Sequence, residues 1–478
     1  MLDSVIDFLN GLLWGKVLIY LLVGAGLFFT LRLGFIQMRY FKHGFTVLKQ
    51  SQRNDAGLSS FEVFCTSMAA RVGTGNMAGV AVAIVAGGPG AVFWMWLIAV
   101  LGMATSMIES TLAQVYKVKD GEGKYRGGPA YYMEQGLGKR WMGILFSICL
   151  IFAFGFAFNA VQANTITDAL FIAFEFDKMW VAAIVVVLCG LVISGGLAKV
   201  ASVAVKVVPV MAVGYIFVAL IVVAMNISEL PGVLLLIVKS AFGLQEVVTG
   251  GVAYTIAQAM QSGIARGLFS NEAGMGSAAN VAASAAANPN HPAAQGFVQM
   301  LGVFFDTLVI CSATAAIILL TGAHENAGDL NGIALTQMAL TSEVGQWGAI
   351  FVAISILLFC FTSIIANYSY AETNVLFLSK NNTKVLLPFR ALVLGMVLFG
   401  SLAQLQTVWN LADVTMGLMA VVNIVAILLL SGLAVRVIRD YKQQLAKGQE
   451  PSFDPTQFDE LKGSSVEQVW PSEEGKKA

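Results

Sequence analysis

Long apolar stretches recur along the chain, and each is about as long as a helix that crosses a lipid bilayer. A crossing helix needs about 20 mostly apolar residues. The pattern predicts eleven such spans, at roughly 14–34, 58–86, 90–116, 141–172, 179–195, 199–225, 245–285, 294–322, 345–378, 385–405 and 407–435. Two shorter external helices are expected between spans, at 229–243 and 330–342. The sequence therefore predicts an all-α integral membrane protein.

Two of these spans are interrupted by glycine-rich polar stretches. The first stretch runs from Ala69 to Gly79 and the second from Arg266 to Ser277. Glycine in a helix interior costs about 1 kcal/mol relative to alanine, so both stretches favour local unwinding. Unwound backbone at membrane depth persists only where protein buries it or where it lines a cavity.

The interrupted spans begin two sets of five spans that follow the first span. Because five is odd, the second set must lie inverted in the membrane, and matching breaks in inverted halves indicate a central transport site. We expect an extra N-terminal helix with a basic loop (1–57), a first repeat (58–225), an external linker (226–244), a second repeat (245–435) and a polar cytoplasmic tail (436–478). The tail is expected to be solvated and to have no core of its own.

Close helix packing is the alternative interpretation of the breaks. The residues Gly75 to Gly79 fit a small-residue packing motif well. Packing alone does not explain why Thr74, Asn76, Asn271 and Glu272 accompany the glycines. Both breaks together therefore favour a binding site.

Composition and charge support a membrane protein and give its orientation. Hydrophobic residues make up 57% of the chain and charged residues 12%, about half the roughly 25% charged residues of soluble domains. Lys and Arg gather in alternate loops, which predicts an external N-terminus and a cytoplasmic C-terminus. The formal net charge is zero, so no nucleic-acid partner is expected. Short loops and no recognisable targeting segment favour a bacterial inner membrane.

The ends of the first break suit an amino acid and a cation together. Free N–H groups at Thr74, Gly75 and Asn76 would begin the second half-helix, where partial positive charge favours a carboxylate. Free carbonyls of Ala69 and Val72 would end the first half-helix and favour a hard cation.

Other spans can supply further oxygen atoms. Thr362 and Ser363 form an adjacent hydroxyl pair in the ninth span, although such hydroxyls also bond back to their own helix. Gln162 is costly to expose to lipid and is expected to face the interior.

Several ionisable residues fall inside predicted spans, where burial is expensive and function or ion pairing is expected. They are Arg71, Glu109, Asp168, Arg266, Glu272, Asp306, Glu372 and Asp413. Structural ion pairs that lock helices are the alternative for most of them. Glu272 lies within the second break, so we expect a direct gating or structural role for it.

Other classes of function fit the sequence less well. An intramembrane enzyme needs a metal motif or a nucleophile with a base, and the chain has three histidines and no such constellation. A divalent-metal pocket needs an anionic oxygen in the first break; Asn76 and Met77 are present there, but no aspartate is. Proton coupling through Glu272 stays open, and a channel is the remote alternative because paired breaks favour alternating access.

Four long motifs, in order along residues 1 to about 440, make the chain resemble the alanine/glycine:cation symporter family. They are Arg71–Asn76 (RVGTGN), Gly87–Trp96 (GGPGAVFWMW), Arg126–Ala130 (RGGPA) and Phe269–Ser277 (FSNEAGMGS). The resemblance implies the leucine-transporter fold, with two inverted five-helix repeats and one extra helix before them. It also implies sodium-coupled uptake of alanine or glycine, with sodium as the coupling ion and no cofactor.

The resemblance also implies two sets of site residues. Those lining the substrate site would be Thr74, Gly75, Asn76, Gln162, Phe269, Met275, Gly276 and Ser363. Those binding sodium would be Ala69, Val72, Thr362 and Ser363.

One position departs from the family pattern. Many alanine-selective relatives have a tryptophan in the segment after the hydroxyl pair, where this chain has Asn367. If that tryptophan walls the pocket, Asn367 leaves space and adds a hydrogen-bonding group. Asn367 is therefore a further candidate substrate contact, and glutamine is a second candidate cargo after alanine or glycine.

Overall fold

The computed structural model is almost entirely helical over the residues that it describes. These are residues 2–244, 248–249, 252–253, 255–325, 327–328 and 330–471. The first residues of the expected span 245–285 lie partly outside them. The helices are α1 (Leu2–Leu12), α2 (Leu18–Arg32), α3 (Ile36–Arg39), α4 (Phe41–Lys49), α5 (Ser60–Arg71), α6 (Val80–Gly87), α7 (Gly90–Val115), α8 (Pro129–Gln135), α9 (Arg140–Leu150), α10 (Phe158–Phe174), α11 (Lys178–Ile193), α12 (Gly196–Met225), α13 (Leu230–Ala241), α14 (Ile256–Asn271), α15 (Ser277–Ala283), α16 (Ala293–Val303), α17 (Ser312–Leu320), α18 (Ile333–Val344), α19 (Gln346–Leu378), α20 (Leu386–Leu402), α21 (Leu405–Leu429) and α22 (Ser431–Ala446).

Short π-helical and 3₁₀ segments and two small hairpins complete the described structure. The π-helical segments are Leu13–Val17, Gly75–Gly79, Ile151–Ala157 and Phe304–Cys311, and each joins two α-helices. The 3₁₀ turns are Thr383–Val385, Pro455–Gln457 and Ser465–Gln468. The antiparallel strand pairs are β1 (Val118–Lys119) with β2 (Tyr125–Arg126), and β3 (Val248–Thr249) with β4 (Val252–Ala253).

Eight helical stretches of the described chain are long and apolar enough to cross a membrane. They are Ile6–Arg32, Gly90–Val115, Arg140–Phe174, Gly196–Met225, Ala293–Leu320, Gln346–Leu378, Thr383–Leu402 and Leu405–Leu429. The pair Ser60–Arg71 and Gly75–Gly87, bent by 50°, makes a ninth if it is one span. The other two expected spans correspond to α11, which has only 16 residues, and to the interrupted pair α14 and α15. A multi-pass helical membrane protein is therefore confirmed, and the count of eleven stays a prediction.

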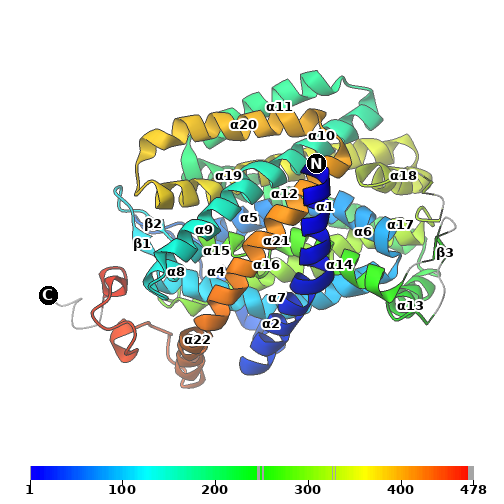
Figure 1. Ribbon diagram of the computed structural model, residues 1–478. Helices are drawn as coiled ribbons and strands as arrows, with labels where there is room; N and C mark the ends of the chain where they lie inside the picture. The colour runs from blue at the N-terminus through cyan, green and yellow to red at the C-terminus, as the bar shows by residue number, and fades with distance from the viewer. Residues whose placement is uncertain are drawn as a thin grey trace.

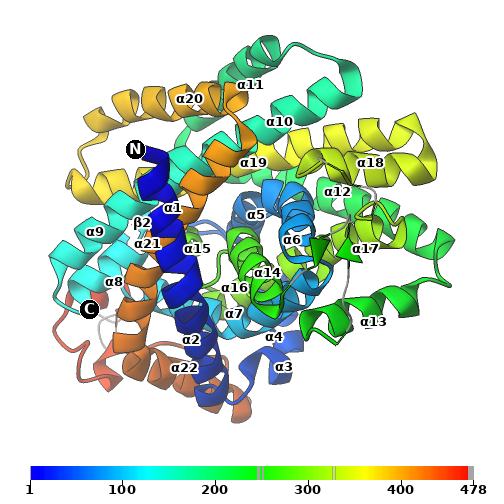
Figure 2. The same ribbon diagram turned by 45° about the vertical axis from the view of Figure 1, so that its right-hand side comes forward.

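The interrupted helices lie in the middle of the molecule. Figure 2 shows α5, α6 and α14 surrounded by the other helices. Helices α11 and α20 pack together along one edge, and α1 and α2 pack against α21 (Figure 1). The two short helices expected between spans are present as α13 and α18. Free backbone N–H and carbonyl groups inside the molecule need hydrogen-bond partners. Because both breaks lie at the centre, neighbouring side chains must supply those partners.

The prediction of a solvated C-terminal tail is wrong for the described part of residues 436–478. Helix α22 crosses the expected boundary, and the following segment buries apolar side chains against the rest of the protein. These are Phe453, Phe458, Leu461, Val466 and Trp470. The Trp470 indole donates a hydrogen bond to the carbonyl of Gln114 (3.0 Å), at the end of α7. The polar sequence hid this docking because the apolar residues are too widely spaced to form a periodic pattern.

Candidate functional site

The first break divides one helix into two halves at the centre of the molecule. Helix α5 starts with a capping box in which Ser59 and Glu62 satisfy each other's backbone N–H groups. It stops at Arg71 because Val72 is extended, with φ −80° and ψ 94°. The chain resumes as a helix at Gly75 in a new direction. Unwinding was predicted here from the glycines, and the structure has it at that place.

Gly73 allows three chain segments to meet at the break. A Cβ at this position would lie 2.4 Å from the Ser363 hydroxyl oxygen and 2.6 Å from the Gln162 side-chain oxygen. A Cβ that close would push the Ser363 hydroxyl and the Gln162 amide away, so glycine at this position lets both side chains reach the break.

The N–H end of the break is satisfied by side-chain carbonyls. The Gln162 Oε1 atom accepts from the Thr74 N–H (2.9 Å) and from the Thr74 hydroxyl (2.8 Å). The Asn76 Oδ1 atom accepts from the Gly73 N–H (2.9 Å). The Thr74 N–H and the Gln162 side chain therefore meet, whereas Asn76 takes part through its side-chain oxygen and its own N–H bonds to the Gly73 carbonyl (3.3 Å). All three residues are buried.

The carbonyl end of the break faces the hydroxyl pair of α19. The Ser363 hydroxyl lies 2.9 Å from the Ala69 carbonyl oxygen and 3.2 Å from the Val72 carbonyl oxygen. The Ser363 hydroxyl also lies 2.9 Å from the Phe359 carbonyl oxygen of its own helix, and the Thr362 hydroxyl bonds to the Leu358 and Phe359 carbonyls of that helix. Three of the four expected sodium ligands thus converge, and the Thr362 side chain has the helix-bonded orientation of the alternative.

A buried carboxylate supports the start of the second half-helix. The Asn76 amide donates to Asp306 Oδ1 (2.7 Å), and the Ser270 and Thr307 hydroxyls donate to Asp306 Oδ2 (2.8 and 2.7 Å). Ser270 belongs to the second interrupted helix, so Asp306 joins the two breaks. The sequence marked Asp306 only as an ionisable residue in a span, because this tertiary contact leaves no local pattern.

The second break is a short left-handed turn held by another buried carboxylate. Glu272, Gly274 and Gly276 have positive φ angles of 60°, 95° and 77°. Glu109 of α7 accepts from the N–H groups of Gly274 (3.4 Å) and Gly276 (3.1 Å). It also accepts from the Asn423 amide (3.0 Å). Glu109 therefore caps the break, a role that its isolated position in the sequence did not reveal.

Glu272 has a local bond within the second break. Its carboxylate accepts from the Ser277 hydroxyl (2.6 Å), at the start of α15. This arrangement agrees with the structural role that was one of the two expectations for Glu272, and the gating role stays a prediction.

The three residues of the second break that were expected to line the substrate site lie in different surroundings. Phe269 lies over the first break: its ring is 3.0 Å from where a Gly75 Cβ would be, and it stacks on Phe158 at 4.3 Å. Gly276 instead packs against Pro129 and Asn423. Met275 is buried, and its N–H bonds to the Glu272 carbonyl (3.2 Å).

Asn367 lies one helical turn from Ser363, on the same face of α19. Its amide group donates to the Asn159 Oδ1 atom (3.1 Å). Its own Oδ1 atom is buried and has no hydrogen-bond partner among the described residues. Asn159 was not expected from the sequence, although it lies three positions before Gln162 and so shares its helix face.

The other buried ionisable residues divide into paired and unpaired groups. Arg266 forms an ion pair with Asp413, Asp168 pairs with Lys178, and Glu372 lies between two arginines. Among the described residues Arg71 hydrogen-bonds only to Gln299, through its Nη1 atom (3.2 Å), and its Nε and Nη2 atoms have no hydrogen-bond partner there.

Two cavities lie at opposite ends of the interrupted helices. A cavity of about 500 Å³ reaches Leu58, before α5, and Ser284, after α15. A cavity of about 460 Å³ reaches Ala86 in α6 and Gln258 in α14. Since α5 and α6 run from the first cavity to the second and α14 and α15 run back, both breaks lie between the cavities. We call the first the inner cavity and the second the outer cavity, after the orientation that the loop charges predict.

Comparison with known proteins gives the family. The model of the sodium:alanine symporter family matches residues 1–455. A Bacillus subtilis protein described as "Probable sodium/glutamine symporter GlnT" is 49% identical over 472 residues, which is 98% of this chain and 96% of that protein. The amino-acid carrier protein AlsT of the same species is 49% identical over 464 residues, 97% of each chain. The sodium/alanine symporter AgcS of Methanococcus maripaludis is 35% identical over 450 residues, 92% of this chain and 97% of that protein. A family match over nearly the whole length, with the interrupted helices at its centre, establishes that this chain is a transporter and belongs to the sodium:alanine symporter family.

Proposed function

We propose that this protein carries a small neutral amino acid, alanine or glycine, into the cell together with sodium. The observation that carries the proposal is the first break, where a side-chain amide, N–H groups, two backbone carbonyls and a hydroxyl meet within one buried site. A zwitterion presents a carboxylate to the N–H end, and a sodium ion takes the carbonyl end.

The residues of this site have separate tasks in the proposed mechanism. The substrate carboxylate replaces Gln162 as the partner of the Thr74 N–H and is bound there with Gly75 and Asn76. Sodium is the second substrate, held by the oxygens of Ala69, Val72, Ser363 and a rotated Thr362. Phe269 covers the pocket from the outer side. Met275 and Gly276 belong to the second break and are assigned no direct contact with the substrate.

The two cavities on either side of the breaks support alternating access. The Arg266–Asp413 ion pair and the contact of Arg266 with the Trp409 ring (4.3 Å) lie between the outer cavity and Phe269. We propose eleven spans, with one helix before two inverted repeats of five. The first helices of one repeat move against the remaining spans. The N-terminus is external and the C-terminus cytoplasmic in this proposal, in a bacterial inner membrane.

Glutamine is the second candidate cargo, favoured by the unpartnered Oδ1 atom of Asn367. That oxygen can accept from a side-chain amide, which neither alanine nor glycine has. The relative named as a probable sodium/glutamine symporter supports the same possibility.

Uptake into proteoliposomes tests the proposal. Radiolabelled alanine is expected to accumulate under an inward sodium gradient and not under potassium or a pH gradient alone. Unlabelled glycine and glutamine as competitors rank the cargoes, and Asn367→Trp is expected to remove glutamine competition while keeping alanine uptake. Accumulation driven only by a pH gradient would replace sodium by protons, and no accumulation of any of the three amino acids would refute the proposed cargo.

A further inference from the structure

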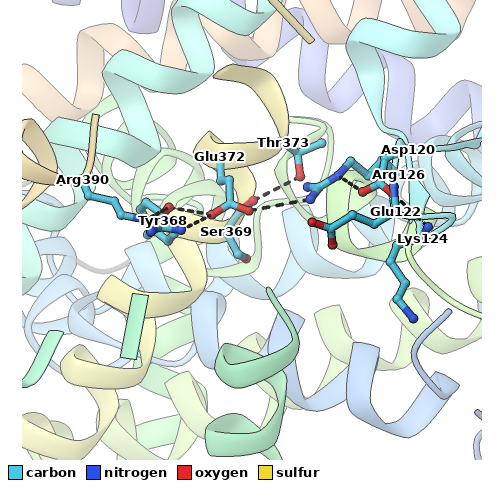
Figure 3. Close-up of polar contacts among 9 residues, drawn as sticks. All are labelled: Asp120, Glu122, Lys124, Arg126, Tyr368, Ser369, Glu372, Thr373 and Arg390. Atoms are coloured by element: carbon cyan, nitrogen blue, oxygen red, sulfur yellow. Dashed lines mark hydrogen bonds and ion pairs between the residues drawn. The ribbon is translucent and has the colours of Figure 1, made fainter. Parts of the chain in front are cut away.

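Glu372 is a buried carboxylate at the inner cavity that the proposed binding site does not use. It lies in the last third of α19, with arginines on both sides (Figure 3). Its Oε1 atom is 3.8 Å from Arg126 Nη2, and its Oε2 atom is 3.7 Å from Arg390 Nη2. The Tyr368 hydroxyl donates to Oε2 at 2.6 Å. A buried carboxylate needs such partners, but one arginine would suffice to neutralise it.

Arg126 belongs to a unit built around the inner ends of the two interrupted helices. The neighbouring Tyr125 N–H donates to the Ala56 carbonyl (2.8 Å), just before α5. The Leu58 N–H donates to the Ser284 carbonyl (3.0 Å), just after α15. We call this hydrogen-bonded unit, residues 54–58, 118–126 and 284–286, the inner arm.

Arg390 belongs to a different part of the molecule. It lies in α20, and its Nε atom donates to the Tyr368 hydroxyl (2.8 Å) of α19. Arg390, Tyr368 and Glu372 therefore stay together if the inner arm moves. The contact of Arg126 with Glu372 crosses from the inner arm to α19. Nearby, the Asn374 amide of α19 donates to Asn280 (3.0 Å) in α15, the helix that leads into the inner arm.

We propose that Glu372 and Arg126 form a charged latch that closes the inner cavity. Opening separates Arg126 from Glu372 when the inner arm swings away from α19 and α20. The carboxylate then keeps Arg390 and Tyr368, and Arg126 keeps its shorter ion pair with Asp120 (2.7 Å), so the opening leaves neither charge unpaired. This explains why one carboxylate has two arginines. The inference rests on the proposed alternating-access function; Glu372 is a positioning residue and does not touch the transported amino acid.

Arg126→Gln and Arg390→Gln are a matched pair of variants for this latch. Each removes one arginine from the same carboxylate at nearly the same distance, but only Arg126 crosses to the inner arm. The reporter is Ser284→Cys, a buried position at the inner cavity, in a transporting background without the five native cysteines. The measurement is the rate at which a charged, membrane-impermeant thiol reagent modifies Cys at this position in inside-out vesicles.

Arg126→Gln is expected to raise the modification rate by roughly fivefold, because it shifts the population toward the inward-open state. Arg390→Gln is expected to change it by less than about twofold, and Glu372→Asp is expected to stay close to the unsubstituted protein. Equal rates in Arg126→Gln and the parent, or equal increases in both arginine variants, would overturn the latch. If Arg126→Gln does not reach the membrane, Arg126→Lys takes its place and is expected to give a smaller increase.

Uptake into right-side-out vesicles that contain the same variants separates the two proposals. Sodium-driven alanine uptake with no change in thiol reactivity overturns the latch and leaves the proposed function standing. A raised reactivity in Arg126→Gln without sodium-driven uptake of alanine, glycine or glutamine by the parent supports the latch and refutes the proposed cargo and ion.

Discussion

At the scale of single residues, the site depends on hydrogen bonds that a side chain at position 73 would block. Gly73 admits the Ser363 hydroxyl and the Gln162 amide to the first break. Ser363 in turn reaches both carbonyls at which the first half-helix ends. The consequences of changing these residues can be predicted individually.

Ser363→Ala is expected to raise the sodium concentration for half-maximal uptake by about tenfold, because it removes the one side-chain oxygen that faces both free carbonyls. Ser355→Ala is the matched control, since it removes a buried hydroxyl two turns earlier in the same helix. Sodium-titrated uptake in proteoliposomes measures both. An unchanged sodium dependence in Ser363→Ala would place the ion elsewhere.

Gly302→Ala is expected to destabilise the protein by about 1–3 kcal/mol, as overpacking in a filled interior does. A Cβ at this position would lie 2.0 Å from the Arg71 Nη1 atom, so the buried guanidinium must move away from Gln299. In α20, Gly395 has no atom within 4 Å of its would-be Cβ, and Gly395→Ala is the control. Thermal unfolding of the purified variants is the measurement, and equal melting temperatures would show that Arg71 relaxes freely.

At the scale of elements, the interrupted helices are held by single carboxylates and the C-terminal segment by aromatic contacts. Glu109 caps the second break and Asp306 joins it to the first. The C-terminal segment docks where His291 lies between the rings of Tyr441 and Phe453. His291 lies outside the spans. Because the docked segment covers its ring, docking affects its protonation.

The docking of the C-terminal segment is expected to weaken as pH falls below about 6.5. Burial lowers the pKa of His291 below its usual 6.5, and the hydrogen bond to Asp440 offsets only part of that effect. The undocked state therefore binds a proton at a higher pH than the docked state. Docking becomes less stable once the pH falls below the pKa of His291 in the undocked state. Above that pKa the histidine is neutral in both states, so docking keeps its full stability.

Limited proteolysis of residues 447–471 at pH 7.5 and pH 5.5 measures this effect. Faster cleavage is expected at the lower pH, and His291→Gln is expected to reduce the difference between the two. A cleavage rate that does not depend on pH would contradict the role of His291.

At the scale of the whole molecule, the breaks lie between two cavities. Whether one cavity opens while the other closes can therefore be tested. In our proposal, the Arg266–Asp413 pair closes the outer side and the contacts of the inner arm close the inner side. In a transporter, opening one end must close the other, whereas a channel opens both at once.

Asp413→Asn is expected to favour the outward-open state because it removes the carboxylate that holds Arg266. In the cysteine-free background, the reactivity of Ala265→Cys at the outer cavity should rise roughly fivefold, and that of Ser284→Cys should fall. Gln406→Ala, which also lines the outer cavity but pairs only with Asn410, is the control. A rise at both positions would indicate a continuous pore and refute alternating access.

The sequence by itself determined the class of protein and the position of the breaks. Apolar length, glycine clusters and the motifs around Asn76 and Glu272 are local signals, because helix formation and unwinding depend on neighbours along the chain. The same local pattern located the first break, since both of its ends lie within a few residues, while the binding roles of its donors and acceptors stay predictions.

Only the tertiary structure decided which distant residues complete the site. Asp306 beneath Asn76, Glu109 at the second break, Asn159 beside Asn367 and the docked Trp470 are contacts between segments more than a hundred residues apart in the chain. A buried polar group must find a partner, but its own sequence does not say which one. Packing makes that choice, and so it decided the partners while the sequence decided the spans.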